Sequence, residues 1–240
     1  MNAPPVPHPL QITARNALRH PPDAPASSRR KKRSVGYQSA FWPNASTLSI
    51  GFVDDDLSPE HKQKIIDAIN QWQPYVNLTF EFIDGREDQP GYGKGDIRIT
   101  TESSQNYSVI GTAAKANDPW TPTMVLGIEP SDPKFASTVM HEFGHALGAE
   151  HEHQHPEADI PWDLPKVYAF YASKGHSAEV VDESVLAKLP AEGTLMLPYD
   201  RLSIMHYPVD NALTLGDWEV GINSTLSEKD KAFMRKAYPR

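Results

Sequence analysis

Cysteine is absent from the 240-residue chain, which excludes disulfides, thiolate metal ligands and cysteine nucleophiles together. Any bound metal must therefore be held by His, Asp, Glu or Tyr side chains. No run of eighteen apolar residues is present either, so we expect no membrane-spanning helix. Hydrophobic residues still make up 39% of the chain and aromatic residues 9%, which is enough for a core and argues against wholesale disorder.

The first 36 residues lack Phe, Trp and Tyr, and seven prolines fall within the first 25. Without apolar side chains to offset the entropy lost on ordering, segment 1–36 is predicted to be a disordered extension, and residues 37–240 a folded domain. The five cations at 29–33 are typical of a solvated linker, a processing site that ends a pro-segment, or a targeting tail. The segment lacks the apolar stretch of a signal peptide, so we expect a cytoplasmic protein or export by a signal-independent route.

Positive charge is concentrated in that tail. Residues 1–33 hold seven cations and one anion, which is a net charge of +6. The whole chain has a net charge of −8, so residues 34–240 carry −14. A nucleic-acid-binding protein carries its basic patch on the folded surface, so we expect no nucleic-acid partner.

Alternation of apolar residues and helix-capping signals predict a domain of the α+β class. Strands are expected at 47–53, 77–83, 96–100 and 123–128, and helices at 132–147, 163–172 and from Ser227 onward, the last with Phe233, Met234 and Tyr238 pointing inward. A further helix should begin at Ser58-Pro59 and present one apolar stripe made of Ile65, Ile66, Ile69 and Trp72.

Five of the ten histidines lie between residues 141 and 155. His141 and His145 are four residues apart on a predicted helix, so both imidazoles project from one face, roughly 6 Å apart at their bases. That separation suits two ligands of a tetrahedral zinc ion. Glu142 lies one step around the helix, where it can hold the attacking water without binding the metal itself.

Gly148 stands where this helix must stop, because glycine accepts the left-handed conformation that ends a helix. The chain can then reverse, so that His151 reaches the metal from a third direction. The complete string HExxHxxGxxH, from His141 to His151, is a strong signal for a catalytic zinc site. His153 and His155 are expected at the surface or behind the metal ligands rather than on the metal.

Residues 203–208 read Ser-Ile-Met-His-Tyr-Pro, and Glu152 directly follows His151. With these motifs the sequence resembles the metzincin metallopeptidases, and within them most closely the astacin family, over roughly residues 41–238. The resemblance implies that residues 203–207 form the family's Met-turn, with Met205 as an apolar floor beneath the zinc. It also implies that Tyr207 is a further, detachable zinc ligand that stabilises the transition state, and that a processed amino terminus folds inward toward Glu152.

The resemblance further implies the metzincin architecture. A mixed, twisted sheet and the active-site helix would lie above a substrate cleft, and the Met-turn and the C-terminal helix would lie below it. The expected function is a zinc-dependent endopeptidase that binds one Zn²⁺ and acts on proteins or peptides, with residues 37–240 as the catalytic domain and a monomer favoured.

Glu142 would act as general base, and Tyr207 would donate a hydrogen bond to the developing oxyanion. Three alternatives stay open at this point. One is a matrixin-like or other metzincin protease in which Tyr207 is not a zinc ligand. The second is a non-catalytic interaction protein that uses the metal site structurally, although a closed structural site has no use for a general base. The third is an interaction protein directed by its basic tail, whose function would be lost on deletion of residues 1–33.

Overall fold

The structure is a computed structural model that describes residues 36–84 and 95–240. The expected extension therefore lies outside the described residues, except for its last residue, Gly36. That residue already belongs to strand β1 (Gly36–Tyr37), which pairs antiparallel with β7 (Thr194–Leu195).

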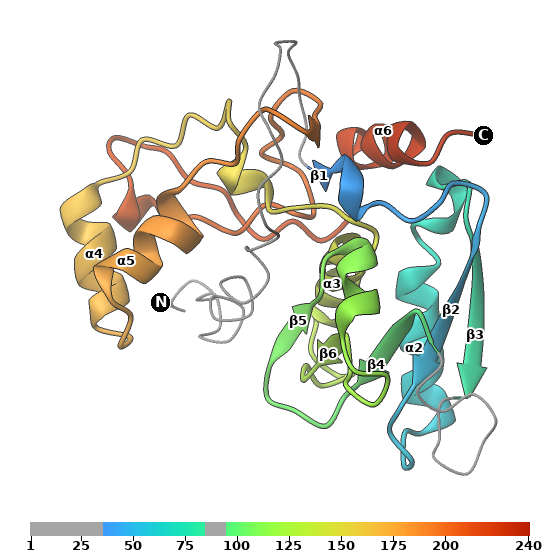
Figure 1. Ribbon diagram of the computed structural model, residues 1–240. Helices are drawn as coiled ribbons and strands as arrows, with labels where there is room; N and C mark the ends of the chain where they lie inside the picture. Colours follow the sequence, from blue (N-terminus) through green and yellow to red (C-terminus); the bar gives the residue numbers. More distant parts are fainter. Residues whose placement is uncertain (1–35, 85–94) are drawn as a thin grey trace.

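A five-stranded mixed sheet forms one layer of the molecule (Figure 1). Its strands, in the order β3-β2-β4-β6-β5, are Thr79–Asp84, Thr47–Phe52, Ile97–Thr100, Met124–Leu126 and Asn106–Ser108. The first four run parallel, and β5 pairs antiparallel with β6 at the edge. Parallel strands need covered faces, which explains why β4 is buried at all four positions.

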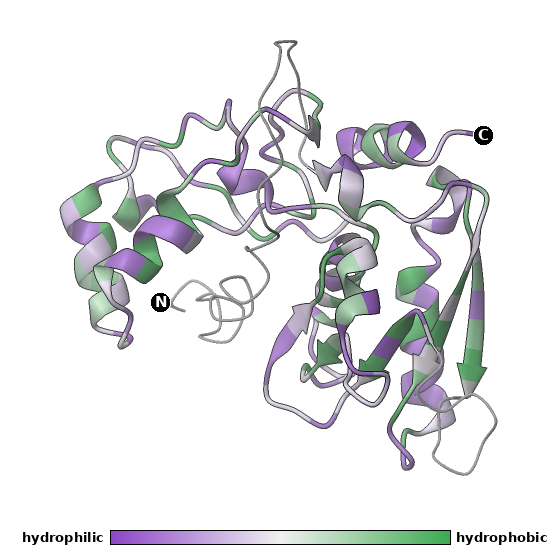
Figure 2. Ribbon diagram, in the orientation of Figure 1, coloured by the Kyte–Doolittle hydropathy of each residue, from purple (hydrophilic) through white to green (hydrophobic). Residues whose placement is uncertain are grey.

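Helices α2 (Pro59–Ile69) and α3 (Phe135–Ala146) pack against each other and share one hydrophobic core with this sheet (Figure 2). Ser58 accepts a hydrogen bond from the backbone N–H of His61, so the predicted start of α2 is confirmed. The completely buried side chains of this core include Ile50, Ile65, Ile69, Ile97, Ile99, Met124, Val139 and Phe143. The core thus holds α3, which carries the histidine string, against the sheet.

The structure differs from the sequence-based elements at several places, three of which concern the core and the sheet edge. Helix α2 ends at Ile69, so Trp72 lies beyond it, although Trp72 is buried and its Nε1–H donates to the Met140 carbonyl at 3.0 Å. Helix α3 begins at Phe135 rather than at Asp132, because Asp132 accepts from the Lys134 N–H in the turn before the helix. Strand β5 was not predicted, since Asn-Tyr-Ser shows no apolar alternation.

The second half of the chain contains α4 (Leu164–Ala172), α5 (Ala178–Val181), a π-helical segment η5 (Asp182–Leu186) and α6 (Glu228–Ala237). Five short 3-10 helices complete the described elements: Gln38–Ala40, Gln73–Tyr75, Gly111–Ala116, Glu152–Gln154 and Asn211–Leu213. Figure 1 shows α4 and α5 side by side, away from the five-stranded sheet, and they have a small hydrophobic core of their own.

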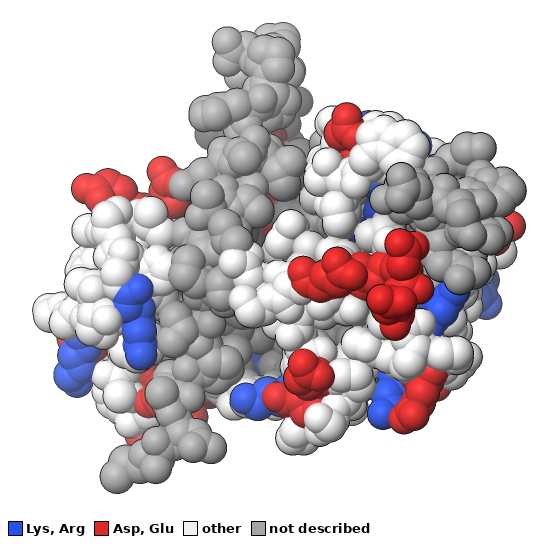
Figure 3. All heavy atoms as spheres, turned by 90° about the horizontal axis from the view of Figure 1, so that it is seen from below, with Lys and Arg blue, Asp and Glu red and all other residues white. Residues whose placement is uncertain are grey.

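Helix α6 begins with a capping box formed by Ser227 and Asp230, and its inward residues Phe233, Met234 and Tyr238 belong to the main core, as expected. Within the described residues no helix is long and apolar enough to cross a membrane. Figure 3 shows acidic side chains gathered in clusters on one face, with fewer lysines and arginines between them.

Candidate metal centre and active site

Three histidine side chains, two from α3 and one from the loop that follows it, meet at one point. His141 and His145 project from α3, and His151 follows the end of the helix. The Nε2 atom of His151 lies 3.2 Å from Nε2 of His141 and 3.0 Å from Nε2 of His145. His145 and His151 are buried, whereas His141 is half-buried.

Backbone carbonyls orient two of these rings. Nδ1 of His141 lies 2.8 Å from the Ile204 carbonyl, and Nδ1 of His145 lies 2.7 Å from the Ala149 carbonyl. A carbonyl oxygen can only accept, so each Nδ1 carries the hydrogen and each Nε2 presents a lone pair. Lone pairs that converge in this way repel one another unless a cation lies between them.

The three nitrogens fit a zinc ion. Nitrogens at 2.0–2.1 Å from one tetrahedral centre are about 3.3–3.4 Å apart, close to the separations found here. Neutral imidazoles also match the borderline-soft character of zinc, and in a chain without cysteine they are its best protein ligands. His141, His145 and His151 are the group that could hold a metal ion among the described residues.

Gly148 makes this convergence possible. It has a φ of +96° directly after the last turn of α3, and the N–H of Ala149 donates to the Gly144 carbonyl at 2.9 Å. A Cβ at Gly148 would also lie 2.7 Å from the Phe41 ring. The expected left-handed helix end is therefore found, and it turns the chain back toward His151.

Glu142 and Tyr207 lie next to the histidine cluster. Glu142 belongs to α3, directly after His141, and only 2% of its surface is exposed. The ring of Tyr207 lies 4.0 Å from that of His151 and stacks at 5.7 Å on that of His141, centroid to centroid. The structure thus places the Tyr207 ring beside His141 and His151, and it holds Glu142 buried on α3 directly after His141.

Residues 203–207, the expected Met-turn, pack directly against α3. A Cβ at Gly144 would lie 2.4 Å from Sδ of Met205 and 3.3 Å from the Trp72 ring, so only glycine allows this approach. Met205 is buried. Sequence reasoning missed Gly144, although a glycine in the middle of a helix is unfavourable and is a signal that something lies close to the backbone there.

Asp230 of α6 holds the Met-turn in place. Its carboxylate accepts hydrogen bonds from the Ser203 hydroxyl at 2.6 Å and from the Ile204 N–H at 2.9 Å, and the Ser203 hydroxyl in turn accepts from the Met205 N–H. Burial raises the pKa of Asp230, and these hydrogen bonds oppose that shift. The sequence shows that Asp230 helps to begin α6, but it does not show that the same carboxylate binds Ser203 and Ile204.

Glu152 ties the third histidine to the Met-turn. Its N–H donates to the Met205 carbonyl at 3.0 Å, and its carboxylate accepts from the Asp200 N–H at 2.8 Å. Burial raises the pKa of Glu152 well above its usual range.

His206 of the expected Met-turn is also affected by burial, which lowers its pKa to about 4. Its imidazole is therefore neutral at physiological pH, and it forms a hydrogen bond with the Tyr199 hydroxyl.

Of the two positions expected for His153 and His155, the surface is wrong for both, and His153 lies behind the metal ligands, with its ring 5.4 Å from that of His151. Both rings are buried, with 4% and 0% exposed, because the 3-10 helix η4 (Glu152–Gln154) turns them inward. His155 donates from Nε2 to the Leu197 carbonyl and accepts the Glu157 N–H at Nδ1. Nε2 of His153 lies 3.3 Å from the Ser184 carbonyl.

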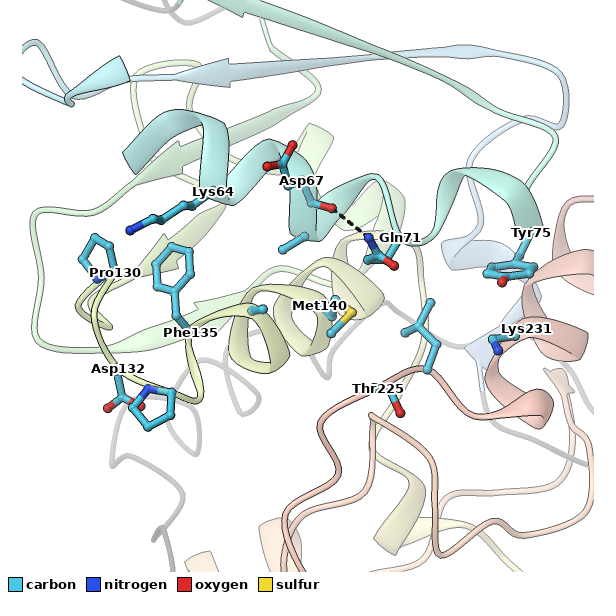
Figure 4. A pocket seen from close by; sticks show the side chains of 14 residues that line it. Lys64, Asp67, Gln71, Tyr75, Pro130, Asp132, Phe135, Met140, Thr225 and Lys231 are labelled. Carbon is cyan, nitrogen blue, oxygen red and sulfur yellow. Dashed lines mark hydrogen bonds between the residues drawn. The ribbon is translucent and has the colours of Figure 1, made fainter. Parts of the chain in front are cut away.

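A pocket of about 550 Å³ lies elsewhere, between α2, the first turns of α3 and the start of α6 (Figure 4). Its apolar wall includes Phe135 and Met140, and Lys64 and Lys231 lie at its edge. Neither the three histidines nor Glu142 and Tyr207 line it, so this pocket is separate from the candidate active site.

A sequence model of the Astacin peptidase family matches residues 34–238, which is most of the chain. The chain therefore belongs to the astacin family, which decides against the matrixin-like assignment. It is 25% identical over 184 residues to zinc metalloproteinase nas-39 of Caenorhabditis elegans, covering 77% of this chain and 18% of that protein. It is 28% identical over 170 residues to meprin A subunit beta of Rattus norvegicus, covering 69% and 20%. The chain thus spans about a fifth of the length of these curated relatives.

Solved structures agree with this assignment. The structure of myroilysin is 39% identical with a TM-score of 0.78, covering 86% of this chain and 98% of that one. The structure of high choriolytic enzyme 1, a hatching enzyme zinc-protease from Oryzias latipes, has 18% identity and a TM-score of 0.57, covering 82% and 94%, and it supports the fold alone. The expected α+β metzincin fold is confirmed, and zinc is the metal of this family's peptidases.

The contact between Gly144 and Met205 gives a prediction about stability. Gly144→Ala should lower the free energy of unfolding by about 1–3 kcal/mol, because a methyl group there forces Met205 away from α3. The measurement is urea unfolding of the variant and the wild type. Gly221→Ala is the matched control, since a Cβ at Gly221 meets nothing within 4 Å, and it should change stability by less than about 0.5 kcal/mol. Equal midpoints for both variants would show that the Met-turn can move away without loss.

Proposed function

We propose that this protein is a zinc-dependent endopeptidase and that residues 37–240 form its catalytic domain. One observation carries the proposal: Nε2 of His151 lies 3.2 Å from Nε2 of His141 and 3.0 Å from Nε2 of His145, and Glu142, which directly follows His141 on α3, is not part of this ligand group. Membership of the astacin family supports the same activity. We infer that the substrates are proteins or peptides, that nucleic acid is not a partner, and that the catalytic domain acts as a monomer.

His141, His145 and His151 would hold the zinc, and Tyr207 would be a further, detachable ligand. The bound ion supplies Lewis-acid chemistry, which polarises the scissile carbonyl and makes water acidic enough to attack near neutral pH. Hydrogen bonds from Nδ1 of His141 and His145 to backbone carbonyls keep the ligand lone pairs directed inward.

Glu142 accepts the proton of the attacking water and then returns it to the leaving amine, because a carboxylate can serve as base in one step and, once protonated, as acid in the next. The hydroxyl of Tyr207 donates a hydrogen bond to the oxyanion that develops on the carbonyl oxygen. Met205 supports the site from below through its contact with α3. No nucleophilic serine or cysteine takes part in this scheme.

Metal content tests the ligand assignment. The purified protein should contain about one zinc per chain, and His145→Ala should reduce this content severely, because two imidazoles hold zinc far less firmly than three. Metal analysis after dialysis gives the result. His176→Ala is the control, since its ring contacts Tyr171, far from the cluster in the fold, and it should retain zinc. Full zinc content in His145→Ala would contradict the assignment.

Substitution of the general base separates a peptidase from a non-catalytic metal protein. Glu142→Gln should retain zinc and fold but lose proteolysis by a factor on the order of 10² or more, because the amide cannot accept the proton. The assay is cleavage of an unstructured protein, followed by mass mapping of the fragments with and without chelator. Near-native turnover would assign the proton transfer to another group, and a wild type without chelator-sensitive cleavage would favour the metal-binding interaction protein.

The proposed role of Tyr207 gives a separate outcome. Tyr207→Phe keeps the ring and removes one oxyanion donor, so kcat should fall by roughly 10²–10³ while zinc content stays unchanged. Steady-state kinetics and metal analysis on the same preparation give both quantities. A variant that keeps full kcat, or one that loses its zinc, would contradict an astacin-like role for Tyr207.

A further inference from the structure

Tyr207 is surrounded by imidazole rings. Besides the contact with His151, its ring stacks on that of His153 at 4.8 Å between centroids with an angle of 26° between the planes. This separation falls within the 4.5–7 Å range of favourable aromatic pairs. His153 lies outside the string His141–His151, so the ligand motif gives it no role.

His153 is itself firmly held. Only 4% of its surface is exposed, and its Nε2 lies 3.3 Å from the Ser184 carbonyl, which can only accept a hydrogen bond. The next residue, Gln154, makes two further bonds to the same region: Nε2 donates to the Glu183 carbonyl at 3.0 Å, and its own carbonyl accepts the Leu189 N–H at 2.8 Å. The ring of His153 is therefore a fixed surface rather than a mobile one.

The π-helical segment η5 supplies the carbonyls that fix it. Val185 of this segment packs with Val167, Tyr171 and Val181 in the separate small core of α4 and α5. Irregular π-helical turns occur often at functional sites, and here the turn directs the Ser184 and Glu183 carbonyls at consecutive residues of η4. A part of the chain that contributes no metal ligand thus reaches the active site through His153.

We propose that His153 is a positioning residue for Tyr207: its buried ring sets where the Tyr207 ring rests beside His151. The proposal rests on the proposed function, because it concerns the group that would donate to the oxyanion. A flat ring pressed on one face of the tyrosine restricts the positions available to the hydroxyl. Since a displacement of about 1 Å at a reacting group can cost about 10²-fold in rate, loss of this surface should lower turnover.

A double-mutant cycle on the purified protein tests the proposal. His153→Ala should lower kcat roughly 10- to 100-fold with KM changed much less, because substrate binding does not depend on the Tyr207 hydroxyl. In a Tyr207→Phe background the same change should cost almost nothing further, since the hydroxyl that it positions is already gone. Equal losses in both backgrounds would overturn the proposal.

His155→Ala is the matched control. His155 is as deeply buried as His153, lies two residues away and bonds to a backbone carbonyl, but its ring contacts Tyr199 rather than Tyr207. His155→Ala should lower kcat by the same factor in the wild type and in the Tyr207→Phe background. Thermal unfolding and zinc content, measured for every variant, identify any loss that comes from the fold or the metal.

Two conservative variants carry the test if His153→Ala does not fold. His153→Phe keeps a flat ring against Tyr207 but loses the hydrogen bond to Ser184, whereas His153→Gln keeps an N–H for that carbonyl but has no ring. The phenylalanine variant should retain most of kcat, and the glutamine variant should not. The reverse order would overturn the proposal and assign His153 to the fold alone.

The outcomes distinguish this proposal from the one on which it rests. If the wild type shows no chelator-sensitive proteolysis, or if Tyr207→Phe is fully active, the proposed function or the role of Tyr207 fails, and the positioning role fails with it. If the wild type is active and Tyr207→Phe is impaired but kcat is insensitive to His153, only the positioning role is overturned.

Discussion

The reversal of the chain at Gly148 is the constraint on which the site depends. Three imidazole nitrogens can meet only if α3 stops directly after His145 and the backbone turns back at once toward His151. A φ of +96° and a Phe41 ring against the glycine leave no room for any other residue. The same reversal places the Glu152 N–H on the Met205 carbonyl, so the third histidine and the Met-turn are positioned together.

The Met-turn is held from two sides. Met205 approaches α3 so closely that position 144 must be glycine, and Asp230 at the start of α6 accepts hydrogen bonds from Ser203 and Ile204. The Ile204 carbonyl then orients His141. Because α6 belongs to the main core, the geometry of one histidine depends on packing near the C-terminal end of the chain. Such a network makes the site rigid, as a preorganised catalytic centre requires.

The region of α4, α5 and η5 has its own small core and contacts the site through η4. Such a region would ordinarily be regarded as peripheral support. Here it fixes two consecutive side chains, His153 and Gln154, directly after the third histidine and its neighbouring glutamate. Its effect on the chemistry is therefore exerted through the orientation of rings, and it can be measured separately from stability.

The sequence by itself determined the local features. The spacing of His141 and His145, the glycine that ends α3 and the Ser227 cap depend on residues within one or two helical turns, so periodicity and side-chain type suffice to predict them. Only the tertiary structure decided which side chains are in contact: Met205 with Gly144, Asp230 with Ser203, and His153 with Tyr207. These contacts join segments that are tens of residues apart in the sequence. The short strand β5 likewise forms because it pairs with β6, and its own sequence shows no alternation of apolar residues. Local propensity contains no information about such pairings, because their free energy arises only when the whole core packs.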